Sequence, residues 1–515
     1  MLGLDLSLSG QAMLARAGSS AIPVPPAPPA ALAYLPALGT AGAAYHLVVS
    51  NERLLETYGG PLLSAGGDIG AGRSGVGAGE VQAARGTGEA LRVAGWYDQS
   101  GRGHHAIAAT PAEMPALRED LRIGNALAIA FDGIRSGDGR GAQPRRITAT
   151  TALDAGNCTL ACVIDPTVSV QEQYYWELRT AANNATAIGH FQHPGRRFGG
   201  ALPGNHGNIK INNRDCGRKI ATVPQVMLVR VRGGSMDVFL DGAKIAALPA
   251  PVGAAGPLSI GHAGNGSGLD AFIPTFRLGA FVAIDRGVDD ADVAAVTGAL
   301  ATRFAIPASY EAVVVNIGSS RVAGMSRSTC TRNKAWFERA NYGARRIRTY
   351  NLGQDGKAIS GCFADRAAFD VELYRPDIPV VYVIDDPIND LGGLGASTDP
   401  GTIYATYTQY RAALAALGPN VRVVVATCLP QASGTYGAFG RPDAAVEADR
   451  RTLNALIAGN GAGANAVADP AAVAAMGTYP DSAVDLLLYG DGLHPTSKGY
   501  ALAAGANPAA VLGVL

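Results

Sequence analysis

Apolar and polar residues alternate in short runs along the first half of the chain, from about residue 44. The clearest pair is Met227–Arg232 and Met236–Leu240, joined by Gly233-Gly234-Ser235. Alternation with a period of two places one side of a strand in a core and the other in water, and the glycines allow tight turns. Similar runs lie at Ala126–Phe131, Thr159–Ile164 and Tyr174–Leu178, and a helical pattern at Asp289–Phe304 ends the region. Many short strands with few helices predict an antiparallel β-sandwich over about residues 44–306.

The pattern changes at Tyr310, where apolar runs begin to alternate with helical stretches. The clearest helix is Thr402–Leu417, whose apolar residues recur at steps of three and four before Gly418-Pro419 stops it. The predicted strands are Ala312–Ile317, Ile347–Leu352, Val380–Ile384 and Val421–Thr427, with a fifth at Val484–Leu488. This alternation predicts an α/β/α domain over residues 310–515, with a parallel sheet and a site at the carboxyl ends of its strands.

The first 43 residues have a different texture. Residues 1–21 are apolar with small polar interruptions, and residues 22–43 are rich in proline. Prolines favour a stiff, extended segment without a core of its own. Two interpretations stay open: a frayed tail with a linker, or an anchoring peptide and a spacer. No apolar run is long enough to span a bilayer, and residues 1–6 lack a basic region and carry Asp5 where a signal peptide would be apolar. We therefore expect synthesis in the cytoplasm without a signal peptide.

Charge and cysteine usage exclude several classes of protein. Forty-two basic residues balance 42 acidic ones, so bulk charge favours neither a nucleic-acid partner nor an anionic membrane. The six cysteines are scattered, without a C-x-x-C pair or a histidine at zinc-finger spacing. We therefore expect buried free thiols, no metal site and no cofactor.

The segment Asp491-Gly492-Leu493-His494 is the first candidate for chemistry. An Asp and a His three residues apart can share a helical turn, so that the carboxylate orients the imidazole. Seven of the eight histidines lie at or before His262, which leaves His494 as the one candidate base in the second half. The alternative is that His494 only caps a turn before Pro495.

Polar residues follow four of the predicted strands. The segments are Gly318-Ser319-Ser320-Arg321, Gly353-Gln354-Asp355-Gly356, Pro387-Ile388-Asn389-Asp390 and Asp491-Gly492-Leu493-His494. In this order they resemble the four blocks of the SGNH, or GDSL-like, hydrolases, which contribute Ser, Gly, Asn and His. The resemblance covers about residues 310–515.

The resemblance implies a role for each residue. Ser320 would be the nucleophile, His494 the general base and Asp491 the group that orients it. The backbone N–H groups of Ser320 and Gly356 and the side chain of Asn389 would form the oxyanion hole. The sequence departs from the family at Ser319, where the family has Asp, and at Pro387, where it has Gly.

A second resemblance covers about residues 44–130. Trp96-Tyr97-Asp98-Gln99-Ser100-Gly101 resembles a segment of the arabinofuranosidase B type catalytic domains, and the strands up to about residue 306 resemble a concanavalin A or laminin-G type sandwich. No pair of carboxylates matches a glycosidase motif, so the resemblance implies sugar binding rather than glycoside hydrolysis. Trp96 and Tyr97 are the candidate stacking residues, the alternative being that they are core.

These features together predict a protein that meets a glycan-coated surface. Without an export signal, the combination resembles a spike or tail fibre of a phage or gene transfer agent. We expect a component of the virion surface that binds host capsular polysaccharide and hydrolyses O-acetyl esters on it. Its other expected partners are virion proteins that contact residues 1–21 and further copies of the chain in a homo-oligomer. Two alternatives stay open: an inactive receptor-binding fibre with a decayed site, or a free bacterial carbohydrate esterase.

Overall fold

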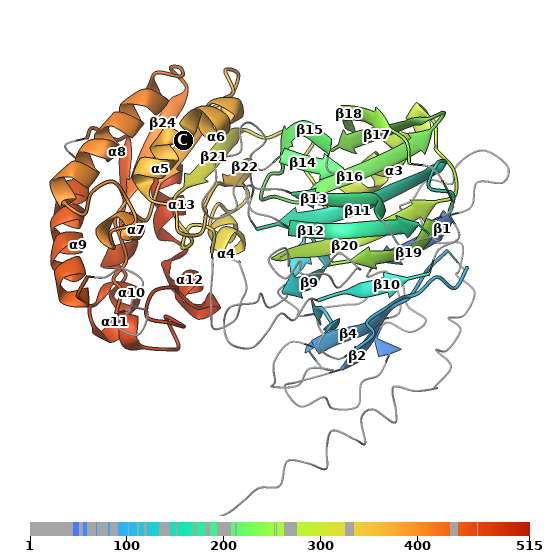
Figure 1. The fold of residues 1–515 in the computed structure, drawn as a ribbon, viewed down its shortest axis with the longest axis horizontal. Coiled ribbons are helices and arrows are strands. Elements are labelled where there is room, and N and C mark those ends of the chain that lie inside the picture. Colours follow the sequence, from blue (N-terminus) through green and yellow to red (C-terminus); the bar gives the residue numbers. More distant parts are fainter. Residues whose placement is uncertain are drawn as a thin grey trace, which may run out of the picture.

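The computed structural model describes two bodies, each built on its own sheet (Figure 1). The described residues are 45–50, 55–58, 68–69, 81–82 and 91–515, the last range with gaps at 101, 111–112, 118–120, 133–144, 151–152, 168, 170–172, 181–185, 193–207, 212–213, 252, 254, 262–274, 325–333, 433–440 and 461. The predicted anchoring peptide and proline-rich linker at residues 1–43 lie outside these ranges.

The first body is a sheet of 18 strands whose pairings are all antiparallel. The strands are β1 (Tyr45–Ser50), β2 (Leu55–Tyr58), β3 (Asp68–Ile69), β4 (Leu91–Trp96), β5 (Ala106–Ile107), β6 (Ala116–Leu117), β9 (Ile129–Asp132), β10 (Ile147–Ala149), β11 (Cys158–Pro166), β12 (Gln173–Thr180), β13 (Thr186–Gln192), β14 (Asn208–Ile211), β15 (Arg214–Lys219), β16 (Gln225–Arg232), β17 (Ser235–Leu240), β18 (Ala243–Pro249), β19 (Ala255–Ile260) and β20 (Thr275–Ile284). A separate hairpin joins β7 (Arg122–Ile123) to β8 (Ala126–Leu127). The predicted large antiparallel sheet is therefore confirmed.

The sheet turns back on itself around one core. Leu160 of β11 and Val229 of β16 share this core with Trp176 of β12 and Leu258 of β19. The next residues along β11 and β16 face the opposite side, where they pack against helix α3 (Asp290–Arg303). Strands buried on both faces read as mostly apolar runs, which is why β11 and β20 are apolar along most of their length and buried at every position.

The predicted hairpin between β16 and β17 is present, with Gly233 at φ 59° and Gly234 at φ 78°. Positive φ at both central residues is the geometry that glycine permits in a two-residue turn. One detail of the predicted alternation is wrong. Arg230 is buried rather than wet, because its guanidinium pairs with Asp237 at 2.7 Å.

The second body is a parallel sheet in the order β22-β21-β23-β24-β25. Its strands are β21 (Ala312–Ile317), β22 (Ile347–Asn351), β23 (Val380–Ile384), β24 (Val421–Ala426) and β25 (Ala466–Ala468). The helices are α4 (Lys334–Ala340), α5 (Ile359–Ala364), α6 (Arg366–Leu373), α7 (Ile388–Leu391), α8 (Pro400–Ala415), α9 (Asp443–Ala458), α10 (Ala474–Gly477), α11 (Asp481–Val484), α12 (Ser497–Ala503) and α13 (Ala506–Val514), with a 3₁₀ turn at Pro470–Ala472. Side chains of α5, α8 and α9 pack on one face of the sheet and those of α13 on the other, as the α/β/α prediction requires.

Four of the five predicted parallel strands are confirmed to within one residue, but the fifth is wrong. The apolar run Val484–Leu488 forms the end of α11 and a turn, and Leu486 and Leu487 are both 68% exposed. The fifth strand is instead the short β25, whose Ala-Val-Ala sequence carries little hydrophobic signal.

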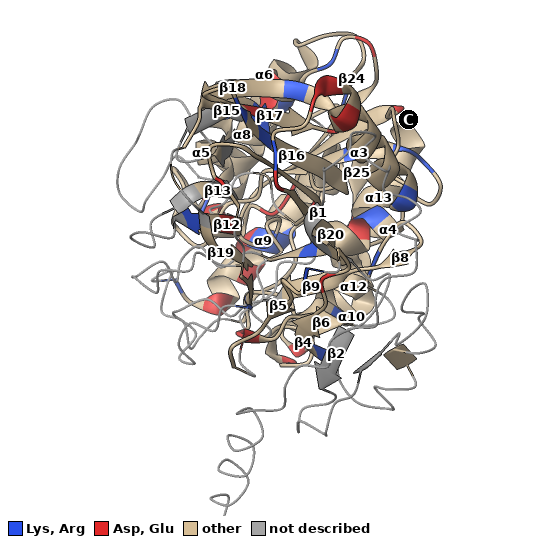
Figure 2. Cartoon of the chain, turned by 90° about the vertical axis from the view of Figure 1, so that its right-hand side faces the viewer, with Lys and Arg blue, Asp and Glu red and all other residues tan. Residues whose placement is uncertain are grey.

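Charge and hydropathy add two observations. Figure 2 shows acidic and basic residues interspersed over the face that it presents, without a stripe of one sign. Among the described residues, no helix is both long and apolar enough to cross a membrane.

Candidate active site

The turn after β21 presents Ser320. Gly318 packs so closely against the turn after β23 that a Cβ on it would lie 2.2 Å from the Asp385 carbonyl oxygen. The Ala323 N–H donates to the Ser319 carbonyl at 3.0 Å and closes the turn. Ser320 lies on this turn with only 5% of its surface exposed.

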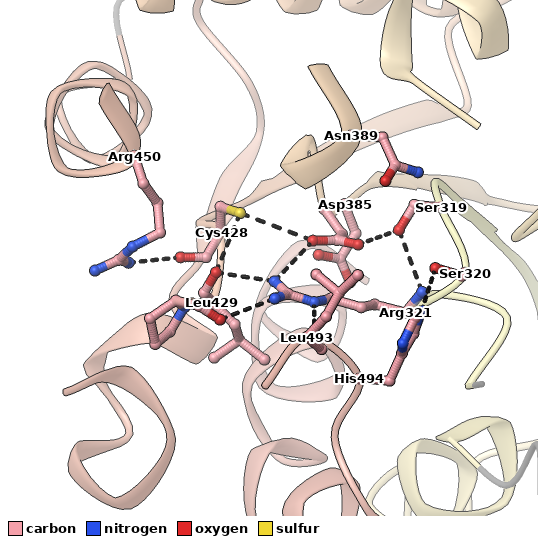
Figure 3. A network of polar contacts seen from close by, with 12 residues as sticks. Ser319, Ser320, Arg321, Asp385, Asn389, Cys428, Leu429, Arg450, Leu493 and His494 are labelled. Carbon is pink, nitrogen blue, oxygen red and sulfur yellow. Dashed lines mark hydrogen bonds and ion pairs between the residues drawn. The ribbon is translucent and has the colours of Figure 1, made fainter. Parts of the chain in front are cut away.

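His494 meets Ser320 from the far end of the chain. The Ser320 hydroxyl lies 2.9 Å from His494 Nε2 (Figure 3). His494 Nδ1 lies 2.7 Å from the Asp491 carboxylate. The three predicted triad residues are thus joined in one chain of hydrogen bonds. All three are buried, although they come from positions 174 residues apart in the sequence.

The predicted helical turn at Asp491 is wrong, because this segment is an irregular loop. The Asp491 carboxylate accepts the backbone N–H groups of Leu493 at 2.9 Å and His494 at 2.6 Å, and Gly492 has φ 73°. A carboxylate that caps its own backbone two and three residues on forms a tight local turn without a helix. One side chain therefore both shapes the loop and holds the imidazole.

Asp491 is ionised in this setting. Burial alone would raise its pKa, but the hydrogen bonds from the His494 ring and from the two backbone N–H groups outweigh burial and hold the pKa below its usual value. An ionised carboxylate accepts the proton on Nδ1 and leaves the lone pair on Nε2 directed at Ser320.

The candidate oxyanion donors lie on two neighbouring turns. Asn389, in α7, donates a side-chain N–H to the Lys357 carbonyl at 2.9 Å, which places its amide beside the turn that contains Gly356. Gly356 is exposed on that turn with φ 70°. The same turn is tied to the nucleophile turn, since the Gln354 N–H donates to the Gly318 carbonyl at 3.1 Å.

The departure from the family pattern at Pro387 does not disturb this turn. Pro387 immediately precedes α7, and its carbonyl accepts the N–H groups of Asp390 and Leu391. Proline is well tolerated at a helix start, where the N–H it lacks has no partner within the helix.

Gly353 positions the two turns against each other. A Cβ on Gly353 would lie 2.1 Å from the Ala323 backbone nitrogen. Only a glycine lets the backbone after β22 approach the nucleophile turn so closely.

Two buried charged residues of the site were not predicted from the sequence. Arg321 follows the nucleophile, and Asp386 follows β23; they form an ion pair at 3.3 Å and are 2% and 4% exposed. Asp386 also accepts a hydrogen bond from Ser319. The clue in the sequence was an arginine directly after the candidate nucleophile. If such an arginine is buried, it needs a partner, because an unpaired buried charge is very costly.

Trp96 and Tyr97 do not offer faces for sugar stacking, which corrects the expectation for these residues. They are 0% and 1% exposed, because Trp96 belongs to the core of the antiparallel sheet and Tyr97 packs edge-on against His105 at 5.0 Å. The segment after them is a structural turn, in which the Asp98 carboxylate accepts the N–H groups of Ser100 and His104. Tyr175 and Trp176 are buried as well.

No metal centre stands out among the described residues, where no group of three or more His, Cys, Asp or Glu side chains is placed to hold an ion. Five of the six cysteines lie in described segments, where all five are buried and none is joined to another by a disulfide. Burial raises the pKa of the Cys158 and Cys162 thiols to about 12, which leaves them unreactive.

Comparisons with known proteins give partial structural similarity. No family model matches the chain, and no curated protein matches it. Among solved structures, a lipase/acylhydrolase from Enterococcus faecalis is 20% identical over 39% of this chain and 95% of its own, with a TM-score of 0.31. A carbohydrate acetylesterase from Sinorhizobium meliloti is 14% identical over 39% of this chain and 99% of its own, with a TM-score of 0.32. A GH54 α-L-arabinofuranosidase is 14% identical over 50% of this chain, with a TM-score of 0.37, and the chain spans 62% of its length.

Proposed function

We propose that the protein is a serine esterase whose nucleophile is Ser320. The observation that carries this proposal is the unbroken chain from the Ser320 hydroxyl through His494 to an ionised Asp491, with hydrogen bonds of 2.9 Å and 2.7 Å. A serine that only packs in a core needs neither an imidazole at its hydroxyl nor a carboxylate behind that imidazole.

The proposed reaction follows from this geometry. His494 Nε2 takes the proton as Ser320 Oγ attacks the ester carbonyl, and it returns the proton to the alcohol that leaves. Water then attacks the acyl-enzyme with His494 again as the base, which releases the acid and frees Ser320. The Asn389 amide and the backbone N–H groups of Ser320 and Gly356 would meet the oxyanion, each typically worth about 3 kcal/mol of transition-state stabilisation.

A groove of about 360 Å³ runs along Asp491 beside the histidine loop, and its other lining residues are Ala432, Ala483, Val484, Leu486, Gly490 and Gly492. Neither Ser320 nor His494 lines it, so it does not define the acyl site. The substrate that we propose, a short acyl group such as acetyl on a sugar hydroxyl, rests on the sequence resemblances of the two bodies.

For the biological setting, we propose a surface component of a phage or gene transfer agent particle that deacetylates host polysaccharide. The sequence resemblances of both bodies and the segments at residues 1–21 and 22–43 support this setting. With Trp96 and Tyr97 in the core, a polysaccharide has to be bound elsewhere than on these aromatic residues. Co-purification of the protein with particles is the test, and a protein found only free of particles would favour a bacterial carbohydrate esterase.

The activity is tested by acetate release from p-nitrophenyl acetate and from O-acetylated capsular polysaccharide. Ser320→Ala is expected to lower kcat/KM by at least about a thousandfold, because the remaining groups cannot replace the nucleophile. Ser319→Ala is not a suitable control, because Ser319 contacts Asp386. Ser309→Ala is the better one, because Ser309 is exposed and its hydroxyl accepts a hydrogen bond from Arg346. No release by the wild type, or equal release by Ser320→Ala, would overturn the esterase and leave a binding protein on a hydrolase scaffold.

A further inference from the structure

Arg321 connects three segments around the nucleophile. Its Nε donates to the Leu493 carbonyl at 2.8 Å, and its terminal nitrogens donate to the carbonyls of Leu429 at 2.9 Å and Pro430 at 2.8 Å. Figure 3 shows the guanidinium extended from the nucleophile turn between Leu493 and Leu429. Leu493 immediately precedes His494, so the residue after the nucleophile holds the backbone of the residue before the base.

Asp386 completes this arrangement from the turn after β23. Its carboxylate pairs with Arg321 at 3.3 Å and accepts the hydroxyl of Ser319, whose oxygen in turn accepts the Arg321 backbone N–H at 3.2 Å. Asp386 has φ 59°, an unusual backbone conformation for a residue other than glycine. Such strain persists where surrounding contacts impose it.

We infer that Arg321 and Asp386 are the positioning residues of this active site. The buried carboxylate of Asp386 takes the place of the aspartate that the SGNH hydrolases have at the position of Ser319. The inference rests on the proposed function, in which Ser320 and His494 react with the substrate. Arg321 fixes the distance between the Ser320 turn and the His494 loop, and Asp386 supplies the negative charge that a buried guanidinium requires. Neither residue touches the reacting atoms.

The geometry of the donors explains why arginine is needed. A guanidinium presents several N–H groups in a fixed plane and can hold three carbonyls and a carboxylate together, whereas an ammonium is a single point of charge on a flexible stem. Arg321→Lys should therefore keep the ion pair and lose the fixed distance between Ser320 and His494.

Arg450 provides a matched control. It is also a buried arginine, 5% exposed, paired with Glu447 at 2.6 Å and donating to the Cys428 carbonyl at 2.7 Å. It has no hydrogen bond among the described contacts to the Ser320 turn or the His494 loop. Arg450 is linked to Asp386 only through Cys428, whose thiol lies 3.7 Å from the Asp386 carboxylate. Arg450→Lys thus disturbs a buried arginine at the edge of the same network and leaves the Arg321 hydrogen bonds between the nucleophile turn and the histidine loop in place.

The first experiment compares Arg321→Lys with Arg450→Lys on p-nitrophenyl acetate. Arg321→Lys is expected to lower kcat at least thirtyfold with KM changed less than threefold, and Arg450→Lys to keep kcat within threefold. Equal losses in the two variants, or a kcat within threefold in Arg321→Lys, would overturn the positioning role.

A second readout is independent of turnover. The proton between His494 Nδ1 and Asp491 should give a low-field NMR resonance that His494→Ala removes and that persists in Ser320→Ala. We expect Arg321→Lys to broaden or remove it and Arg450→Lys to keep it. If the wild type shows the resonance but no ester is hydrolysed, the proposed function fails while the positioning role stands; if Arg321→Lys leaves the resonance unchanged, the positioning role fails.

The position of the carboxylate is tested by moving it. Ser319→Asp would place a second carboxylate against Asp386 in a site where Ser319 is 0% exposed, and like charges so close oppose each other. Asp386→Ser would leave Arg321 without its counter-charge. Each single variant should lose at least tenfold in kcat/KM, and the double variant Ser319→Asp/Asp386→Ser should recover at least tenfold over the weaker single. If the losses of the two single variants simply add in the double variant, the proposed shift of the carboxylate from position 319 to position 386 is overturned.

Discussion

Asp491 shows how a single residue can serve both the shape and the chemistry of a site. One of its oxygens accepts the two backbone N–H groups that form the loop, and the other accepts the His494 ring nitrogen. Capping the loop backbone requires only an oxygen acceptor. Orienting the His494 ring requires that the group facing Nδ1 carries no proton. The two functions can therefore be separated by one substitution.

Asp491→Asn should keep the loop and lose the catalysis. The asparagine oxygen can still cap the backbone, but its NH₂ group would face Nδ1 and favour the tautomer with a proton on Nε2, which cannot accept one from Ser320. We expect kcat to fall by roughly 10²–10⁴-fold, with the melting temperature changed by only a few degrees. Steady-state kinetics and thermal unfolding of the same preparation measure both.

The pH profile provides a further check at this residue. Because hydrogen bonding lowers the pKa of Asp491 in the folded protein, its carboxylate is already ionised at the pH where histidine titrates. The acidic limb of kcat/KM should then report a single ionisation, without a contribution from Asp491. A limb that requires two protons would show that Asp491 titrates in the same range.

At the scale of elements, helices α6 and α8 meet through a buried carboxyl group. Asp370 of α6 is 1% exposed, and the Tyr410 hydroxyl of α8 donates to it. Its other oxygen is buried without a hydrogen-bond partner. Burial raises the pKa of Asp370 to about 7, against the opposing effect of the hydrogen bond from Tyr410.

The raised pKa makes the packing of these helices sensitive to pH. The folded state binds a proton on Asp370 that the unfolded chain releases near pH 4, so this contribution to stability is complete below about pH 4 and is lost as pH rises to about 7. Asp370→Asn keeps an uncharged group of the same shape. We expect it to raise the melting temperature at pH 8 and to change it little at pH 4.5, as measured by calorimetry. Curves for the two proteins that run parallel across this range would contradict the assignment.

The elements differ in how well their sequences predicted them. Strands β21 and β23 were predicted residue for residue, because each is almost entirely apolar and buried on both faces. The run at Val484–Leu488 is also mostly apolar, but Val484, Leu486 and Leu487 are exposed, since an apolar run does not itself specify a partner that covers it. Strand β25 is the converse case, because three small residues are recruited by pairing with β24 rather than by their own propensity.

The candidate site was predictable only in part from strand ends. Ser320 follows strand β21, as predicted. Asp491 and His494 follow no strand and could be named from their spacing, from the lack of another histidine after His262, and from the order of the four polar segments. Arg321 and Asp386 could not be paired from sequence, since the contact depends on β21 and β23 being parallel neighbours in the sheet. Trp96 illustrates the limit for aromatic residues, whose sequence pattern does not distinguish a stacking face from a core position.

At the scale of the whole molecule, the two bodies share polar contacts that are buried. Asp165, at the end of β11, is 0% exposed and lies between Arg277 of β20, at 2.8 Å, and Arg339 of α4, at 2.7 Å. Asn351, at the end of β22, donates to the Thr167 carbonyl in the first body and to the Val322 carbonyl in the nucleophile turn. The antiparallel body thereby supports the turn that carries Ser320.

Asp165→Asn tests whether the bodies unfold as a unit. Removing the charge leaves the buried Arg277 guanidinium and the partly buried Arg339 guanidinium poorly compensated, and breaking a buried ion pair typically costs about 3–5 kcal/mol. We expect one urea transition in the wild type and two in the variant. The fluorescence of Trp336, whose ring lies 4.6 Å from the Arg277 guanidinium, should report the transition at the lower urea concentration.

Asp237→Asn is the matched control, because Asp237 pairs with Arg230 wholly within the first body. It should weaken that body without giving a separate transition at Trp336. Since Asn351 links this interface to the nucleophile turn, Asp165→Asn should also lower kcat. If Asp165→Asn instead keeps a single urea transition and full kcat, the two bodies are joined but not coupled.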